Sequence, residues 1–221
     1  MFQIESYIDN LIKLLKHNFG SRLLYVGLQG SYLRGEADEK SDIDIMVVLD
    51  YLSIKDLDLY RNIINANSNS DKACGFICGK PELNNWNPCE ICHLVHTTKD
   101  YYGKIIDLVP TYTMEDEKNF IKTSLGNLYH EMCHSYVHAS RESNIKGLPN
   151  TYKSVFFILQ NIYFYRTGDF IKTKQELLSQ LSGEDKEVFV KALEIKNQDI
   201  YDFDEAFQIL FEWCKNTINK V

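Results

Sequence analysis

The segment GLQGSYLRGEADEKSDIDIMVVLD, residues 27–50, decides the fold, because two acids border and enter an otherwise apolar run. The run Ile43–Leu49 has the composition of a buried β-strand, yet Asp42 precedes it and Asp44 lies within it. An unpaired carboxylate in an apolar strand costs several kcal/mol, or its pKa shifts until the group is neutral. We therefore expect a group that compensates both acids.

Strand geometry predicts that these two acids serve one site. Residues i and i+2 of a strand project from the same face with Cα atoms about 6.5 Å apart, so Asp42 and Asp44 can present both carboxylates together. Mg²⁺ prefers oxygen ligands and usually takes the rest of its ligands from water and phosphate. A pair of Mg²⁺ ions would account for the two charges.

A glycine-containing turn precedes the acids. Gly30-Ser31 follows a predicted strand at Leu23–Gln29. Without a Cβ at Gly30, backbone amides can approach a phosphate, and the Ser31 hydroxyl can donate a hydrogen bond to it. Gly35 then allows the chain to turn back toward the second strand.

The complete pattern, G-S-x3-G-x5-S-D-I-D, resembles the signature of the nucleotidyltransferase superfamily that includes DNA polymerase beta. The resemblance implies that Gly30, Ser31 and Ser41 bind a nucleoside triphosphate, with ATP as the co-substrate. It also implies that Asp42 and Asp44 are catalytic residues that bind Mg²⁺, with two ions expected.

The same superfamily adds a third carboxylate on a neighbouring strand. The first candidate is Glu90 in NPCEICHLV, because it is an acid within an expected strand at Cys89–Val95. By the resemblance, Glu90 would be the catalytic base that acts on the acceptor hydroxyl. Asp107 in KIIDLVP is the rival, and Glu82 is a third candidate placed in a loop.

The chain as a whole resembles the aminoglycoside adenylyltransferases of the streptomycin and spectinomycin type. The resemblance rests on a bipartite plan, on CEICHLV, and on ILQNIYFYRTGDFIKTKQEL, which is similar to a helix, Thr-Gly turn and Ser/Thr-Lys segment of their helical domain. It implies that Lys174 reaches the triphosphate; the alternative is an ordinary solvated lysine at a helix start. The Trp-containing continuation usual in that family does not follow Lys174 here, so the acceptor contacts are not identified.

The reaction implied by this resemblance is the transfer of AMP from ATP to a hydroxyl, with pyrophosphate release by a two-metal mechanism. The acceptor would be a small cationic hydroxylated molecule, with an aminoglycoside-type antibiotic as the leading candidate. The alternative is a regulatory or antitoxin-like nucleotidyltransferase that acts on a protein partner, although minimal antitoxin transferases are shorter. The oligomeric state stays open.

The charge balance limits the possible partners. The 221 residues include 31 acids against 24 Lys and Arg, a net charge of -7, whereas phosphate-backbone binders normally carry a basic stripe. This charge favours a cationic substrate. The N-terminus MFQIESYIDNLIKLLKHNFG lacks the features of a secretory signal, and no apolar run reaches membrane-spanning length. We therefore expect a cytoplasmic protein that binds neither nucleic acid nor membrane.

Periodicity predicts an α+β protein with a nucleotidyltransferase domain at residues 1–112 and a helical bundle domain at 113–221. In the first domain, a mixed β-sheet flanked by helices is expected. Its helices are predicted at 2–18 and in IKDLDLYRNIINAN, and its strands at Leu23–Gln29, Ile43–Leu49, Ala73–Cys78 and Cys89–Val95, with GKPELNNWNP as a loop. Thr113 is a predicted N-cap that opens the second domain. Helices are expected there at about 113–139, 150–166, 173–181, 184–196 and 202–219, with RESNIKGLPN as a separator.

A histidine motif in the second domain has the spacing of a zinc site. The segment HEMCH at residues 130–134 matches the metalloprotease motif, and His138 lies one turn further along. Three histidines at i, i+4 and i+8 of one straight helix span about 12 Å and cannot all reach one zinc ion. We therefore expect a polar helix face rather than a protease.

Four of the six cysteines also have suggestive spacing. They form a C-x3-C and a C-x2-C pair, at Cys74, Cys78, Cys89 and Cys92. A C-x2-C pair within a strand directs its two thiols to opposite faces, which disfavours a zinc site. In a reducing cytosol, we expect free buried thiols.

Overall fold

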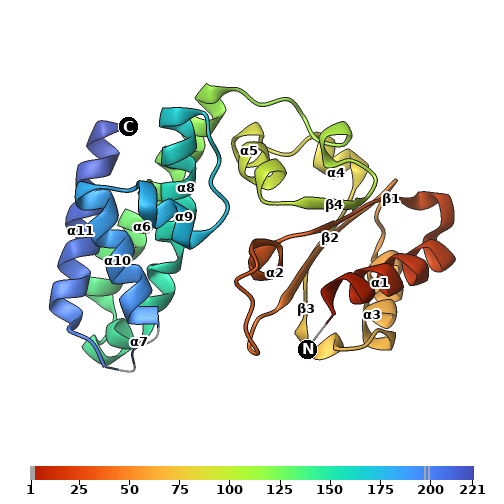
Figure 1. Cartoon of the computed structure of the whole chain (residues 1–221), viewed down its shortest axis with the longest axis horizontal. Coiled ribbons are helices and arrows are strands. Elements are labelled where there is room, and N and C mark those ends of the chain that lie inside the picture. Colours follow the sequence, from red (N-terminus) through yellow and green to blue (C-terminus); the bar gives the residue numbers. More distant parts are fainter. Residues whose placement is uncertain (1–2, 197, 199) are drawn as a thin grey trace. The chain divides into compact units, whose positions relative to one another are not determined.

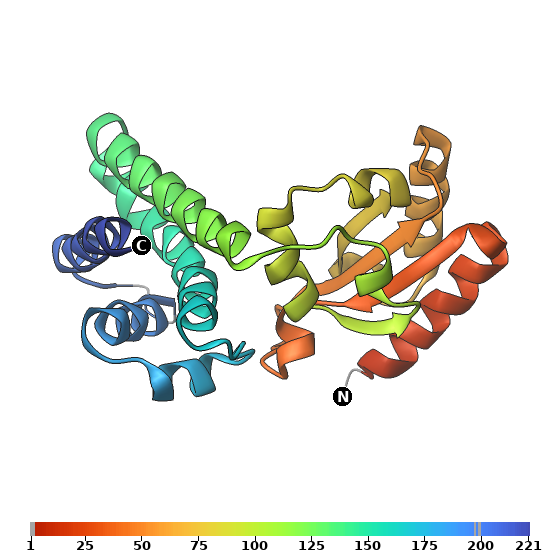
Figure 2. The same cartoon turned by 90° about the horizontal axis from the view of Figure 1, so that it is seen from above.

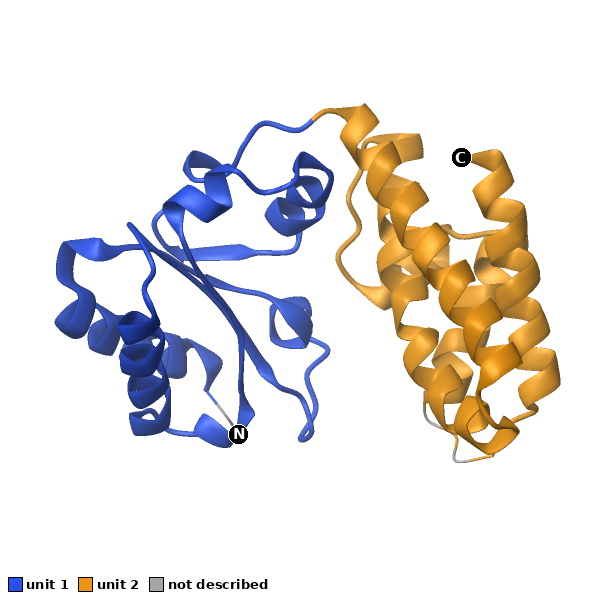
Figure 3. Cartoon of the chain, turned by 180° about the vertical axis from the view of Figure 1, so that it is seen from behind, with its two compact units in different colours: residues 1–112 blue, residues 113–221 orange. Residues whose placement is uncertain are grey.

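The computed structural model describes residues 3–196, 198 and 200–221. The chain divides into two compact units, Met1–Tyr112 and Thr113–Val221, which Figure 3 colours blue and orange. Each unit has hydrophobic core clusters of its own. The α+β class expected from the sequence is confirmed, because the first unit is built on a β-sheet and the second is helical.

The first unit contains a four-stranded mixed sheet in the order β3-β2-β1-β4 (Figure 1). Its strands are β1 (Leu23–Leu28), β2 (Ile43–Leu49), β3 (Ala73–Gly79) and β4 (Lys99–Tyr102). β2 is antiparallel to β1 and parallel to β3, and β4 is antiparallel to β1. Because β2 and β3 are parallel, both strands begin at the same end of the sheet.

Side-chain alternation gives the sheet two different faces. On one face, Ile43, Ile45 and Val47 share a core cluster with residues of α1 (Ile4–Phe19) and α3 (Ile54–Ala66). On the other face, Met46 and Val48 pack with residues of α4 (Lys80–Asn84). The short elements of this unit are η1 (Gly20–Arg22), α2 (Gly30–Arg34), η2 (Ser70–Lys72), α5 (Pro88–His96) and η3 (Ile105–Asp107).

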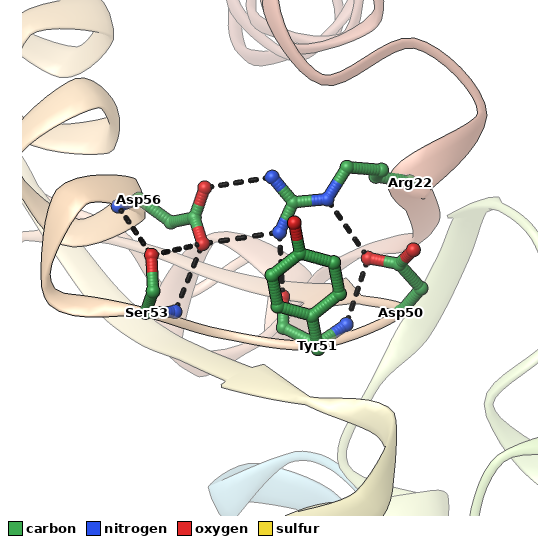
Figure 4. A network of polar contacts seen from close by, with 5 residues as sticks. All are labelled: Arg22, Asp50, Tyr51, Ser53 and Asp56. Atoms are coloured by element: carbon green, nitrogen blue, oxygen red, sulfur yellow. Dashed lines mark hydrogen bonds and ion pairs between the residues drawn. The ribbon is translucent and has the colours of Figure 1, made fainter.

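A network of polar contacts joins the end of β2 and the start of α3 to Arg22, which directly precedes β1 (Figure 4). The Arg22 guanidinium donates to both carboxylate oxygens of Asp56, at 2.8 and 3.0 Å, and to Asp50 Oδ1 at 3.0 Å. The Ser53 hydroxyl and backbone N–H also donate to Asp56 Oδ2, which completes the capping box of α3. These contacts lower the pKa of Asp56, with the Arg22 hydrogen bonds as the largest cause.

The strand expected at Cys89–Val95 is wrong, because these residues belong to helix α5. Pro88 occupies the first turn, where its missing N–H costs nothing, and the Asn87 side chain caps the helix by accepting from Cys89 N–H at 3.2 Å. A short apolar run is compatible with either a strand or a helix, so the local start signals decide its conformation.

Three other segments differ from the sequence prediction. The expected loop GKPELNNWNP contains α4, and the strand at the sheet edge is β4, a short polar segment without an apolar run. The expected separator RESNIKGLPN forms α7 (Arg141–Thr151), which starts at a Ser140 cap. The helix expected at 2–18 is observed as α1, with residue 2 outside the described residues.

The second unit is a bundle of helices around α8 (Lys153–Thr167), whose buried residues lie on several sides. Its longest helix, α6 (Met114–His138), packs against both α8 and α11 (Phe203–Lys220) and is the long green helix in Figure 2. The predicted Thr113 cap is confirmed, because its hydroxyl accepts from Asp116 N–H in a capping box. The other helices are α9 (Lys174–Gln180) and α10 (Gly183–Lys196). Over the part of the chain that is described, no helix has the length and apolar character needed to cross a membrane.

Candidate active site

Asp42 and Asp44 lie at the start of β2, on the face of the sheet that carries Met46 and Val48. Asp42 is exposed and Asp44 is half-buried. Burial is the main cause that raises the pKa of Asp44, and the negative charge of Asp42 raises it further. A hydrogen bond from Cys74 and the charge of Arg34 act in the opposite direction and are not sufficient to cancel the shift. The surrounding protein groups therefore do not fully offset the free-energy cost of ionising Asp44.

The Gly30-Ser31 turn is packed directly against Asp44. Gly30 has φ +68°, a left-handed conformation, and a Cβ at this position would collide with Asp44 Oδ2. The preceding Gln29 N–H donates to the Asp44 carbonyl oxygen at 2.9 Å. Only glycine satisfies both the backbone angle and the close approach. The turn and the acid, 14 positions apart in the numbering, are thus brought together.

Ser31 and Ser41 have different environments at this end of the sheet. Ser31 lies in the first turn of α2, which Gly35 ends in the left-handed conformation at φ +69°. The Ser41 hydroxyl contacts Asp38 Oδ1 at 3.1 Å and accepts from the Asp38 backbone N–H at 2.8 Å. Ser41 therefore closes the turn that precedes β2.

The residue beside Asp44 on the neighbouring strand is Cys74, which sequence reasoning missed as a site residue. The two residues are register partners in the parallel β2–β3 pair, and their side chains are hydrogen-bonded. Cys74 is exposed as a residue, yet partial desolvation is the first cause that raises the pKa of its thiol, and the charges of Asp44 and Asp42 raise it further. The protonated thiol can therefore donate to the Asp44 carboxylate. All residues of β1 and β3 are described, and none of them is Asp or Glu.

Glu90, expected on a strand next to the aspartates, is instead an exposed residue of α5. Its carboxylate accepts a hydrogen bond from Trp86 Nε1, and the Trp86 ring packs edge-on against Phe76 with centroids 5.5 Å apart. Phe76 lies two positions after Cys74 in β3, on the same face. Trp86 therefore links Glu90 to the face of the sheet that carries Asp44.

The other carboxylate candidates lie elsewhere in the first unit. Asp107 is an exposed residue of η3, and Glu82 is an exposed residue of α4. The structure thus places each of the three candidates on a helical element. The acid on the remaining strand of the sheet is Asp100 of β4, which pairs with β1 and accepts a hydrogen bond from the Tyr25 hydroxyl at 2.8 Å.

Lys174 is the first residue of α9 in the second unit and follows the Thr173 cap. It is half-buried, and its Nζ lies 5.5 Å from the centroid of the Phe156 ring. The Lys174 ammonium thus contacts an aromatic ring, whereas a fully solvated lysine would contact only water.

The donors at the start of β2 fit a hard divalent cation. Two carboxylates lie together, one of them incompletely compensated, and the absence of a side chain at Gly30 lets its backbone approach Asp44 Oδ2 closely. Within residues 3–196, 198 and 200–221, no three His, Cys, Asp or Glu side chains are grouped so that they could hold an ion. An ion at this site would therefore take its remaining ligands from water and phosphate. All six cysteines are described, and none of them forms a disulfide. The expected burial holds for Cys78, Cys92 and Cys214 but is wrong for Cys74, which is exposed.

The Gly-Ser turn and the paired aspartates lie in a segment that matches a known family. Residues 8–72 match the family model of the nucleotidyltransferase domain. The first unit thus contains a nucleotidyltransferase domain over these residues.

The whole chain has the fold of a known adenylyltransferase. A crystal structure of spectinomycin adenyltransferase AAD(9) from Enterococcus faecialis with ATP and spectinomycin matches with a TM-score of 0.61 and 15% sequence identity. The match covers 96% of this chain and 99% of that chain. The resemblance to the aminoglycoside adenylyltransferases inferred from the sequence is thus found in the fold.

A second solved structure matches a smaller part of the chain. It is a toxin-antitoxin complex with AMP-PNP, with a TM-score of 0.33 and 22% identity, and the match covers 58% of this chain and 91% of that chain. At this TM-score, the match supports no inference about function. No curated protein matches the chain.

Proposed function

We propose that the protein transfers AMP from ATP to a hydroxyl of a small cationic molecule of the aminoglycoside type and releases pyrophosphate. The observation that carries this proposal is the contact between the Gly30 turn and Asp44, because it joins a phosphate-binding element to an acid that lacks full compensation. The similarity in fold to a spectinomycin adenyltransferase supports the choice of reaction.

In this proposal, each part of the site has a separate role. Asp42 and Asp44 would hold Mg²⁺, with two ions expected, and a metal bound there would supply positive charge that offsets the negative charge of the phosphates and of the reacting oxygens. The Gly30-Ser31 turn places backbone and hydroxyl donors next to the triphosphate. Cys74 keeps the Asp44 carboxylate in position through its thiol hydrogen bond. Catalysis then depends mainly on positioning and electrostatics.

Two roles depend on residues outside the strands. Glu90 is proposed as the general base that takes the proton of the acceptor hydroxyl, and its bond to Trp86 would orient it. Asp107 remains the rival for this role. Lys174 and Ser41 are proposed to contact the triphosphate. Replacement of Glu90 by Gln, with Asp107→Asn as the comparison, distinguishes the two bases through the turnover number and its dependence on pH.

The acceptor is tested by incubating the protein with ATP and Mg²⁺ across a panel of aminoglycosides, spectinomycin and lincosamides. Pyrophosphate release and the mass gain of one adenylyl group on the acceptor are measured together. We expect release only with an accepted compound, and release slower by on the order of a thousandfold in the Asp44→Asn variant. Asp58→Asn is the matched control, since Asp58 is an exposed acid of α3 whose partner is Arg61.

The alternative, a protein acceptor, gives a different result in the same assay. ATP labelled at the α-phosphate would then transfer its label to a protein in a cell extract, while no compound of the panel supports release. That outcome would contradict the small-molecule proposal and retain the nucleotidyl transfer.

A further inference from the structure

Three histidines of α6 form a feature that the proposed reaction does not use. His130, His134 and His138 lie on successive turns of the helix, and all three are exposed. Their rings follow one another along one face, with centroids 5.9 Å apart for His130–His134 and 4.8 Å apart for His134–His138. Exposed imidazoles at this spacing are potential metal ligands.

The glutamate of the HEMCH motif has another function in the fold. Glu131 Oε1 accepts a hydrogen bond from the Thr151 hydroxyl at 2.8 Å, which ties α6 to the end of α7. The carboxylate that would serve as the base of a metalloprotease is therefore engaged in a structural contact. Any function of the three histidines therefore does not involve the Glu131 carboxylate.

Helix geometry favours the second pair of histidines as a chelate. Side chains at i and i+4 have Cβ atoms roughly 5–6 Å apart, and metal–imidazole bonds are about 2.0–2.1 Å long, so two rings can converge on one ion. The His134 and His138 rings are already the closer pair. His134 belongs to both pairs, so the face can hold one chelated ion at a time.

The chemistry of the ligands selects the kind of ion. Neutral imidazole nitrogen suits Zn²⁺, Ni²⁺ and Cu²⁺, whereas Mg²⁺ prefers oxygen. No three His, Cys, Asp or Glu side chains among the described residues are placed to hold one ion together, so an ion held by two histidines would keep several positions for water or another donor. This ion would differ in type and in place from one bound at Asp44.

We propose that His134 and His138 form a binding site for a divalent transition-metal ion, separate from the nucleotide site of the first unit. Affinities follow the usual order for nitrogen ligands, in which Cu²⁺ binds more tightly than Ni²⁺ and Zn²⁺. The chelate exists only while α6 is helical, because the helix fixes the spacing of the two rings. The bound ion therefore stabilises the folded second unit.

The test uses Ni²⁺ as the probe, because nickel favours imidazole and avoids the redox reaction of copper with the cysteines. Isothermal titration calorimetry on the full chain measures the affinity, and thermal unfolding with and without Ni²⁺ measures the stabilisation. We expect His134→Ala and His138→Ala each to weaken binding by roughly tenfold or more and to remove the thermal shift. All three histidines are exposed, so circular dichroism should show an unchanged fold.

His130→Ala is the matched control and should change the affinity by less than about twofold, since it leaves the closer pair intact. Unchanged binding in His134→Ala would overturn the proposal. An equal loss in His130→Ala and His138→Ala would overturn the assignment of the pair. The Asp44→Asn variant should bind Ni²⁺ at this site like the wild type, so the result is independent of the proposed reaction.

Discussion

Asp44 and Asp56 are two acids of the same unit, near opposite ends of β2, and their surroundings shift their pKa values in opposite directions. Asp56 is buried and accepts hydrogen bonds from Arg22 and Ser53, which lower its pKa. Asp44 is half-buried, and burial together with Asp42 raises its pKa. Asp56 is thus stabilised by the fold, whereas Asp44 retains a charge that the fold leaves incompletely compensated.

This contrast separates a structural acid from a candidate functional one. A carboxylate with matched donors contributes to stability and has no need of a ligand. A carboxylate that is desolvated, next to a second acid and against a glycine turn is better stabilised once a cation is bound. Substitutions at the two positions should therefore have opposite consequences for activity and stability.

The largest effect is expected from Asp44→Asn on catalysis. Loss of a metal ligand removes several kcal/mol of charge stabilisation, so turnover should fall by on the order of a thousandfold. The thermal unfolding curve should stay within a few degrees of the wild type. Steady-state pyrophosphate release with the accepted substrate measures the change, and wild-type turnover in this variant would refute the role of Asp44.

The next effect is a loss of stability in Asp56→Asn. The substitution leaves the Arg22 guanidinium without its main partner and weakens the capping box of α3, so we expect a cost of about 2–4 kcal/mol in the free energy of unfolding. Urea denaturation measures it. The Asp58→Asn variant should lose less than about 0.5 kcal/mol, because the Asp58–Arg61 pair is exposed.

The pH dependence of the Asp56 contribution has a definite sign. The folded pKa is lower than the ordinary value of 3.8, so the stabilisation is complete above pH 3.8 and is lost as the pH falls below it. The wild type and Asp56→Asn should therefore converge in stability as the medium becomes more acidic. A gap that stays constant at low pH would contradict the ion-pair explanation.

A smaller effect is expected from Cys74→Asp. The substitution places a third carboxylate on β3, beside Asp44. One further charged ligand is worth about 1.4 kcal/mol or more, so the affinity for Mg²⁺ should increase by roughly tenfold. Calorimetric titration with Mg²⁺ and a non-hydrolysable ATP analogue measures this change. Cys74→Ser keeps a hydrogen-bond donor and should remain close to the wild type. Weaker Mg²⁺ binding in Cys74→Asp would show that residue 74 does not face the metal.

The smallest effect concerns the stability of Asp44→Asn in the absence of metal. Ionised Asp44 costs free energy in the fold because its pKa is raised, so the variant should be more stable than the wild type at pH 7, by no more than about 1 kcal/mol. The difference should shrink as the pH falls through the raised pKa of folded Asp44 and disappear below pH 3.8, where Asp44 is protonated in both states. Urea denaturation across this range detects it, and a variant that is less stable at pH 7 would contradict the pKa argument.

The sequence predicted the parts of the fold whose signals are local. Apolar runs with turn residues between them gave β1 and β2, and the Thr113 cap gave the start of α6. The strand prediction for 89–95 is wrong because the apolar composition of this run fits two conformations, and the Asn87-Pro88 start signal favours the helix. The neighbour of Asp44 could not be predicted, because Cys74 meets it only through the parallel β2–β3 pairing, which is a non-local contact.

The most direct test of the central claim is the binding of a non-hydrolysable ATP analogue, measured with and without Mg²⁺ for the wild type, Asp44→Asn and Asp58→Asn. The account predicts Mg²⁺-dependent binding in the wild type and in Asp58→Asn, and its loss by roughly tenfold or more in Asp44→Asn. Equal, metal-independent affinity in all three proteins would contradict the assignment of Asp44 to a metal and nucleotide site.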